Sequence, residues 1–181
     1  MADLTTLLDR NERFAERFEA GDLNIRPRMS TILLTCLDSR VDPAQLFGLG
    51  LGDALVMRNA GGRVTPGVMR DLAILRVLGA NMPGPSAMQP ELVVIHHTDC
   101  GMARLAKPPL QQQVAQQLGL SDDEVAAMAV TDPAVTVQAD IERLRQTPGA
   151  PDTLVVTGLV YDVSDGTIEQ VVSPAPLRAT T

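Results

Sequence analysis

Short apolar runs alternate along the chain with segments whose apolar residues recur at helical spacing. Four of the runs are short, rich in branched residues and bounded by turn residues, which predicts buried strands. These runs are STILLTC (30–36), ALVMRN (54–59), ELVVIHH (91–97) and DTLVVTGLVYDV (152–163). The last run leads through Asp165-Gly166 into TIEQV, a pattern typical of a hairpin that adds an antiparallel strand at the edge of a sheet.

Helices are predicted between these strands, because capping residues precede the segments with helical spacing. The start signals are Asp42-Pro43, Thr65-Pro66 and the capping box from Ser121 to Glu124. We expect the first helix to reach about Leu49 and the second to end at Gly79. Residues 134–146 predict one more helix. Residues 81–91 predict a Pro/Gly-rich surface loop, and residues 106–113 predict a second break, read as a local insertion.

Strands that alternate with helices predict an α/β fold, with a central, mainly parallel β-sheet flanked by helices on both faces and an antiparallel edge strand. The chain has 181 residues, of which 45% are hydrophobic. That size and composition fit a single domain spanning residues 1–181. Residues 1–25 predict an N-terminal helical arm that packs on this chain or on a partner. Its apolar positions are Leu4, Leu7, Leu8, Phe14 and Phe18.

Composition argues against several classes of function. The formal net charge is -7, aromatic residues make up 2% of the chain and tryptophan is absent, so we expect no nucleic-acid partner. No apolar run approaches the roughly 20 residues that a membrane span needs, and the first residues do not form a signal peptide. Two cysteines are too few for a disulfide framework, which indicates a reduced, cytoplasmic protein.

The only two cysteines and two histidines of the chain cluster at the ends of two apolar runs. Cys36 ends the first predicted strand, His97 ends the third, and Cys100 follows three residues later. In open α/β sheets, ligands bind beyond the carboxyl ends of strands, where the strand order reverses. If these strands are neighbours, two thiolates and an imidazole form a tetrahedral zinc set with one open position. His96 alternates with His97 across the strand, so it should face away and serve in packing or hydrogen bonding.

Other interpretations of these residues stay open. Cys36 alone is most simply a buried apolar residue, and His97 alone a histidine with an ordinary polar partner. A Cys-His nucleophile pair oriented by Asp99 would make a hydrolase that needs no metal. A zinc ion closed by four ligands would be structural and would belong to a binding module without enzymatic activity. The occurrence of both motifs at strand ends favours the zinc site.

The stretch CLDSR adds a second part to this site. Positions 36, 38 and 40 share a face if the chain stays extended beyond the strand. Asp38 could then reach the metal or a nearby water, while Arg40 holds its carboxylate by a two-pronged hydrogen bond. The alternative is an ordinary surface ion pair. The Gly-rich loop RNAGGRVTPG (58–67) lacks the phosphate-loop pattern, and we expect it to form a tight turn near the same sheet end.

At these residues the sequence resembles the β-class carbonic anhydrases. The family's paired motifs lie in the same order and at the same spacing, and the likeness extends from TILLTCLDSR to TGLVYDVSDG. C-x-D-x-R appears as Cys36, Asp38 and Arg40, H-x-x-C-G as His97, Cys100 and Gly101, and R-N-A-G as Arg58 to Gly61. The short length and HHTDCGM are similar to the short bacterial branch of the family.

The resemblance implies a carbonate dehydratase, a zinc lyase that reversibly hydrates carbon dioxide to bicarbonate and a proton. It implies one zinc per subunit, bound by Cys36, His97 and Cys100, in a homodimer or a higher homo-oligomer. Asp38 and Arg40 are then the catalytic dyad, and Asp38 becomes the fourth zinc ligand in an inactive, closed form.

Two features set limits on that resemblance. Relatives that hydrolyse carbonyl sulfide or carbon disulfide retain the same zinc motif, so those substrates stay alternatives. Some members have an accessory bicarbonate site that needs a tryptophan where this chain has Leu33, so we do not expect that mode of inhibition.

Overall fold

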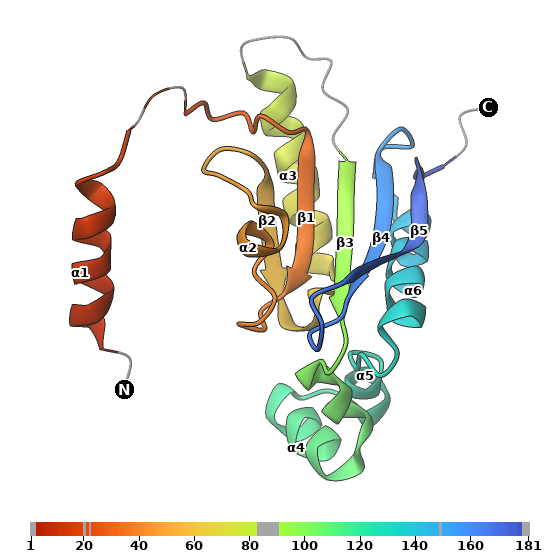
Figure 1. Cartoon of the computed structure of the whole chain (residues 1–181). Coiled ribbons are helices and arrows are strands. Elements are labelled where there is room, and N and C mark those ends of the chain that lie inside the picture. The colour runs from red at the N-terminus through yellow and green to blue at the C-terminus, as the bar shows by residue number, and fades with distance from the viewer. Residues whose placement is uncertain (1–2, 20, 22, 83–90, 149, 179–181) are drawn as a thin grey trace.

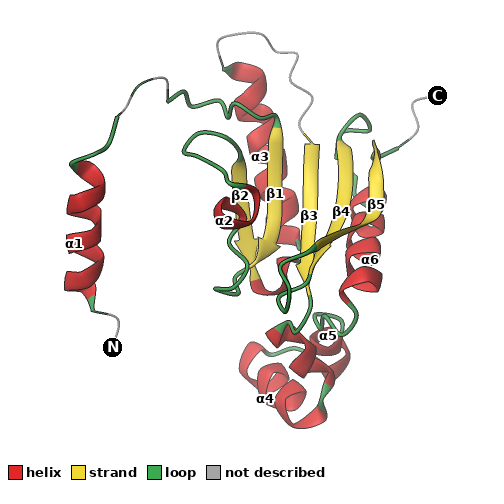
Figure 2. Ribbon diagram, in the orientation of Figure 1, coloured by secondary structure: helices red, strands yellow, loops and turns green. Residues whose placement is uncertain are grey.

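Five strands form one sheet, in the order β2-β1-β3-β4-β5 (Figures 1 and 2). The computed structural model describes residues 3–19, 21, 23–82, 91–148 and 150–178. The strands are β1 (Thr31–Cys36), β2 (Leu55–Asn59), β3 (Glu91–His97), β4 (Val155–Tyr161) and β5 (Ile168–Pro176). All neighbours are parallel except β4 and β5, which are antiparallel. The predicted fold class is therefore confirmed, including the antiparallel strand at the edge.

Helices lie between these strands and before the first one, and the three with predicted capping residues begin where those residues predict. They are α1 (Leu4–Ala15), α2 (Pro43–Phe47), α3 (Pro66–Asn81), α4 (Pro108–Leu118), α5 (Asp122–Ala126) and α6 (Pro133–Gln146), with short 3-10 turns η1 (Ala60–Gly62) and η2 (Gly101–Ala106). The Asp42 side chain accepts from the N–H groups of Ala44 and Gln45, and the Thr65 side chain from Val68. Both halves of the Ser121–Glu124 capping box are present.

Two predicted boundaries were wrong. Helix α3 continues through Gly79 to Asn81, because Gly79 keeps a helical backbone and a glycine is tolerated inside a helix at a modest cost. The segment 106–113 is not a break: its prolines occupy the first turn of α4, where a missing N–H group costs nothing. The loop predicted for residues 81–91 falls mostly on residues 83–90, which lie outside the described residues.

The two faces of the sheet are covered differently. Helices α3 and α6 lie on one face, and their apolar residues pack against Ile32, Leu34, Leu92 and Val94 (Figure 1). The other face carries Leu33, Val93, Ile95 and Tyr161, which pack against short elements around α2 and the β4–β5 hairpin. This alternation follows from the period of two along a strand. Parallel strands buried on both faces explain why their sequences are nearly continuous apolar runs.

Helix α1 stands apart from the sheet (Figure 1). The predicted N-terminal helix is thus present, with Asp3 as its N-cap. None of its residues is buried, and its apolar face is open to solvent. A helix of this length is marginal in water by itself, so its stability requires a surface against which the apolar face can pack.

Candidate metal centre

Cys36, His97 and Cys100 converge at the carboxyl ends of β1 and β3. The two strands are hydrogen-bonded neighbours, and β1 lies between β2 and β3, so the strand order reverses at this point. Both sulfur atoms and a ring nitrogen of His97 lie within 4.8 Å of one another, and all three residues are buried. Two sulfurs and one imidazole nitrogen are a donor set typical of zinc. These three residues could therefore hold a metal ion with a fourth position left for another ligand.

The hydrogen bonding of His97 suits a metal ligand. Its Nδ1 lies 2.8 Å from the carbonyl oxygen of Thr98, a contact in which the ring nitrogen donates. Its Nε2 then has a free lone pair, and that buried atom has no hydrogen-bond partner in the described part of the chain. Metal-binding histidines commonly donate from one ring nitrogen to a carbonyl group and bind through the other. The imidazole therefore fits the proposed ion on an observation that does not depend on the sequence motif.

The two thiols influence each other strongly. The hydrogen bond with Cys100 is the largest of the effects that lower the pKa of Cys36 to about 4, against the opposing effect of burial. The same contact, together with burial, raises the pKa of Cys100 well above its ordinary value. The pair therefore releases one proton easily and keeps the second. A divalent cation would compensate the second negative charge, which is why metal binding to thiols releases protons.

Asp38 and Arg40 form a two-pronged ion pair beside these ligands. Oδ1 of Asp38 accepts from Nε of Arg40 at 3.0 Å, and Oδ2 accepts from Nη2 at 2.8 Å. These hydrogen bonds hold the pKa of Asp38 far below its ordinary value, despite an opposing effect of burial. Both carboxylate oxygens are thus taken up by Arg40, and Asp38 is not one of the three residues whose ligand atoms cluster.

The chain does not stay extended from position 36 to position 40, so the condition for a shared face is not met. Residues 39 and 40 form a turn, in which the backbone N–H of Arg40 donates to Oδ1 of Asp38 at 2.9 Å. Asp side chains favour such turns because they hydrogen-bond the backbone two residues on. The pair forms through this turn and not through a shared strand face.

Asp99 and Arg58 complete the surroundings of the dyad. Arg40 donates from Nη1 to Oδ2 of Asp99 at 2.7 Å and from Nη2 to its carbonyl oxygen at 3.0 Å. The Asp99 carboxylate thus bonds Arg40, whereas Nδ1 of His97 is bonded to the carbonyl oxygen of Thr98. It has a positive φ of 51°, which Asp tolerates better than most residues. Arg58 was not singled out as a site residue; it donates to the carbonyl oxygens of Cys36 and Asp38, and only its place in R-N-A-G pointed to it.

The Gly-rich loop presses against the same strand ends, as expected. Gly62 has a φ of +67°, and a Cβ atom there would lie 2.9 Å from the backbone carbon of Thr35 and 3.0 Å from the nitrogen of Cys36. His96 faces the opposite way from His97, also as expected. It is fully buried, and its Nε2 lies 3.2 Å from the carbonyl oxygen of Gly62.

Comparison with known proteins agrees with this geometry. Residues 31–168 match the family model described as carbonic anhydrase. The chain belongs to the β-carbonic anhydrase family. It is 29% identical over 165 residues to β-carbonic anhydrase 1 of Mycobacterium tuberculosis, covering 91% of this chain and 94% of that protein. The crystal structure of a carbonic anhydrase from Streptococcus mutans has a TM-score of 0.78 and 31% identity, covering 94% of this chain and 98% of the other.

Another relative is named for a different activity. A carbon disulfide hydrolase of Acidianus sp. is 29% identical over 155 residues, which cover 72% of each chain. The family segment contains all five residues singled out at this site, from Cys36 to Cys100.

Within the described ranges, no helix is long and apolar enough to cross a membrane.

Proposed function

We propose that this protein is a zinc-dependent carbonic anhydrase that reversibly hydrates carbon dioxide to bicarbonate and a proton. Cys36, His97 and Cys100 would bind one zinc ion per subunit. The observation that carries the proposal is the convergence of two sulfurs and a buried imidazole at the switch point of the sheet. Among the described residues, Nε2 of that imidazole has no hydrogen-bond partner. Membership of the β-carbonic anhydrase family supports the same activity.

A bound zinc ion would act as a Lewis acid, making a water molecule acidic enough to be a nucleophile near neutral pH. The chain's own residues would prepare the site for that chemistry. Cys36 and Cys100 would hold the ion as thiolates, whose two negative charges would balance its charge. His97 would hold it through Nε2, because its Nδ1–H is bonded to the carbonyl oxygen of Thr98. The backbone N–H of Asp38, 3.4 Å from the sulfur of Cys36, also favours the thiolate.

Asp38 and Arg40 would orient the nucleophile. Because Arg40 lowers its pKa, Asp38 is ionised throughout the physiological pH range and can accept a hydrogen bond from the attacking water. Because Arg40 bonds both carboxylate oxygens, it would also disfavour binding of Asp38 to the ion. Arg40 is 45% exposed and Asp38 18% exposed, so the dyad lies between the buried ligands and solvent. Substrate would enter, and the released proton would leave, on this side.

A stopped-flow assay with a pH indicator tests this function directly. The zinc-loaded protein should acidify a carbon dioxide solution faster than buffer alone, and Asp38→Asn should retain zinc but lose most of that rate. Zinc-loaded protein without measurable hydration activity would refute the proposal and favour a structural zinc site. Activity that persists after complete zinc removal would instead favour a Cys-His hydrolase.

Hydrolysis of carbon disulfide, or of carbonyl sulfide, is the second candidate. The relative from Acidianus sp. favours it, because that protein is named a carbon disulfide hydrolase. The same zinc-loaded sample should therefore be assayed for sulfide release from both compounds. A higher kcat/KM for either compound than for carbon dioxide would make this second candidate the principal activity.

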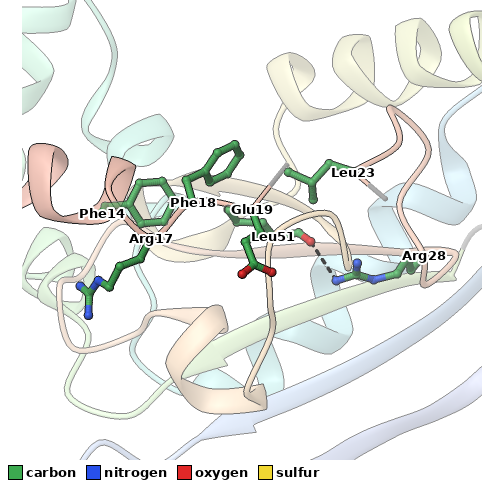
Figure 3. A pocket seen from close by; sticks show the side chains of 7 residues that line it. All are labelled: Phe14, Arg17, Phe18, Glu19, Leu23, Arg28 and Leu51. Carbon is green, nitrogen blue, oxygen red and sulfur yellow. Dashed lines mark hydrogen bonds between the residues drawn. The ribbon is translucent and has the colours of Figure 1, made fainter. Parts of the chain in front are cut away.

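We further propose a homodimer or a higher homo-oligomer in the cytoplasm. The apolar face of α1 is exposed, and a hollow of about 370 Å³ lies between the end of α1 and the loop that carries Leu51 (Figure 3). Phe14, Phe18 and Leu23 line it, and Arg28 on its rim donates to the carbonyl oxygen of Leu51. A second copy of the chain would cover these apolar surfaces. Both cysteines are free of a disulfide, which suits a reducing compartment.

A further inference from the structure

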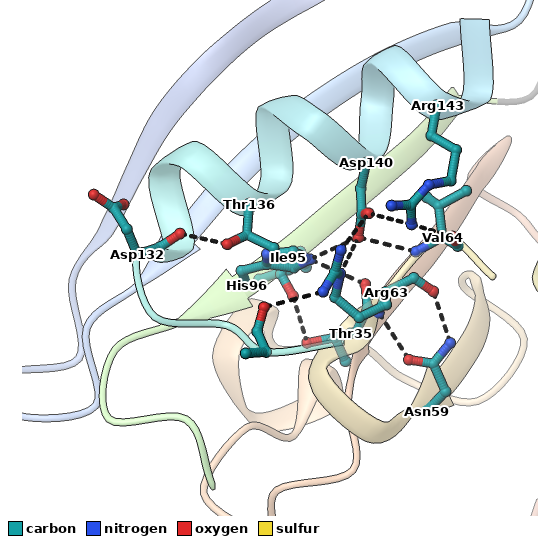
Figure 4. A network of polar contacts seen from close by, with 12 residues as sticks. Thr35, Asn59, Arg63, Val64, Ile95, His96, Asp132, Thr136, Asp140 and Arg143 are labelled. Atoms are coloured by element: carbon teal, nitrogen blue, oxygen red, sulfur yellow. Dashed lines mark hydrogen bonds and ion pairs between the residues drawn. The ribbon is translucent and has the colours of Figure 1, made fainter. Parts of the chain in front are cut away.

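A buried ion pair joins helix α6 to the Gly61–Gly62 turn (Figure 4). Arg63, directly after the turn, donates from Nε to Oδ2 of Asp140 at 2.8 Å and from Nη2 to Oδ1 at 3.1 Å. The Asp140 side chain is fully buried, and that of Arg63 is 6% exposed. Burying two charges costs free energy unless good geometry and further hydrogen bonds compensate. The other hydrogen bonds made by Arg63 and Asp140 therefore indicate which parts of the structure this ion pair fixes.

Donors from three more residues surround the Asp140 carboxylate. The backbone N–H of Val64 donates to Oδ2 at 3.0 Å, and Nη1 of Arg143 donates to Oδ1 at 3.1 Å. Nε2 of His96 lies 3.5 Å from Oδ2. Burial raises the pKa of Asp140, but His96 and Arg63 outweigh that effect and lower it below its ordinary value. The Asp140 carboxylate is therefore ionised, and these donors fix its position.

The third branch of the guanidinium reaches the wall of the metal centre. Nη1 of Arg63 donates to the carbonyl oxygens of Ala127 and Ala129, both at 3.1 Å. The next residue, Val130, is buried and packs against the thiols of Cys36 and Cys100. The position of Val130 against the sulfur atoms thus depends on where Arg63 holds the two carbonyl groups.

The backbone of Arg63 is fixed as well. Its N–H donates to Oδ1 of Asn59 at 2.8 Å, and its carbonyl oxygen accepts from Nδ2 of Asn59 at 2.8 Å. The turn between Asn59 and Arg63 packs tightly against its surroundings, because a Cβ on Gly61 would lie 3.2 Å from Cγ2 of Val130. The turn is therefore enclosed between the end of β1 and Val130, with Arg63 bonded to Asn59 at the end of β2 and to the carbonyl groups of Ala127 and Ala129.

We infer that Arg63 is a positioning residue for the metal centre. Asp140 fixes its guanidinium, and Arg63 in turn fixes the positions of the turn beside Cys36 and of the Ala127–Val130 segment. The inference rests on the proposed zinc site. A lysine could not replace Arg63, because an ammonium group lacks the planar fork that bonds a carboxylate and two carbonyls at once. Residues that support metal ligands from behind are typically worth about 10- to 100-fold in metal affinity.

Arg63→Lys tests the inference, with Arg178→Lys as its matched control. Arg178 also bonds one carboxylate, that of Asp152, and three backbone carbonyls, but it lies after β5, at the opposite end of the sheet from the metal centre. Zinc affinity of the metal-free proteins would be measured by competition with a chelator, beside thermal unfolding. We expect both variants to lose thermal stability, but only Arg63→Lys to bind zinc about 10- to 100-fold more weakly.

The absorption spectrum of the cobalt(II)-loaded protein gives a second readout. Arg63→Lys should shift or weaken the thiolate-to-cobalt and ligand-field bands, whereas Arg178→Lys should leave them as in the wild type. Equal zinc affinity and identical spectra for the two variants would overturn the inference while leaving the proposed function intact. Wild-type protein that binds no zinc would instead refute the proposed metal site itself.

A pair of valines keeps the test decisive if Arg63→Lys does not fold. Val130→Ala and Val125→Ala remove the same two methyl groups from buried positions, but Val125 packs against Leu105 and Ala115 and not against the thiols. Val130→Ala should weaken zinc binding and alter the cobalt spectrum, and Val125→Ala should do neither. Unchanged zinc affinity in Val130→Ala would show that the Ala127–Val130 segment, which Arg63 fixes, does not affect zinc binding.

Discussion

Arg40 holds Asp38 by two parallel hydrogen bonds, at 3.0 Å to Oδ1 and 2.8 Å to Oδ2. The same guanidinium is bonded to Asp99, which lies two residues after His97 in the H-x-x-C-G motif. Arg40 therefore links the C-x-D-x-R and H-x-x-C-G motifs, which come from different strands. This link places the carboxylate of Asp38, beside the proposed metal ligands, under the control of Arg40.

Arg40→Ala should therefore abolish activity without removing the metal. Asp38 loses the partner that occupies both its oxygens, so its carboxylate becomes free to take the fourth ligand position. We expect stoichiometric zinc by elemental analysis and a loss of about 100-fold or more in hydration rate at every pH. Arg28→Ala is the control, because Arg28 makes a comparable pair with Asp53 away from the site. Wild-type turnover at alkaline pH in Arg40→Ala would mean that the dyad assignment is wrong.

Cys36→Ser and His97→Ala should each lose most of the bound zinc. A hydroxyl group does not ionise near neutral pH, so serine cannot supply the thiolate that zinc prefers. Elemental analysis and a thiolate-to-cobalt absorption spectrum would follow the loss. Far-ultraviolet circular dichroism should stay close to that of the metal-free wild type. Full zinc content in either variant would contradict this ligand set.

The buried Asp140 predicts a specific dependence of stability on pH. Its pKa is lower in the folded protein than in the unfolded chain, so it stabilises the fold most above the unfolded value of about 3.9. That contribution should disappear as the pH falls through the lower folded pKa. Urea unfolding of metal-free wild type and Asp140→Asn should differ most at pH 5–7, and the difference should shrink toward pH 3. A difference independent of pH would contradict the ionised state of Asp140.

The strand ends could be predicted from sequence almost to the residue. Strands β1 and β3 end at Cys36 and His97, as their apolar runs do, because strands buried on both faces need apolar residues at every position. The meeting of the two thiols with His97 then followed from one assumption, that β1 and β3 are neighbours. The Asp38–Arg40 pair was also anticipated, although its turn was not.

The supports of the site could not be predicted in the same way. Arg63 and Asp140 are 77 residues apart, and neither lies in a motif that marks it as the other's partner. Their meeting depends on how α6 packs against the sheet, which is a tertiary property. Local signals can also be ambiguous: Pro108 and Pro109 suggested a break because proline both interrupts and starts helices.

The exposed face of α1 predicts that its apolar residues control the oligomeric state. Leu7→Glu places a charge on that face, where Leu7 is 55% exposed in the single chain. Burying this charge against a second copy would cost free energy, so light scattering should report a shift toward monomer at micromolar concentration. Val135→Glu is the control, since Val135 is 61% exposed on α6. Unchanged mass for Leu7→Glu would rule out α1 as the contact.

Comparing Gly62 with Gly119 separates two reasons for a glycine in the Gly-rich loop: the left-handed backbone conformation and the close approach to the strands. Both have a φ of +67°, but a Cβ on Gly119 would meet no atom of the described residues within 4 Å, whereas one on Gly62 would meet the backbone of β1 and β3 at 2.9–3.0 Å. Gly119→Ala should cost about 1–2 kcal/mol in the free energy of unfolding, the usual penalty of a left-handed conformation. Gly62→Ala should cost about 1–3 kcal/mol more, because rigid backbone has to move. That movement displaces the end of β1 at Cys36, so zinc affinity should fall for Gly62→Ala alone. Equal unfolding free energies for the two variants, measured in urea, would mean that the loop can withdraw from the strand ends without consequence.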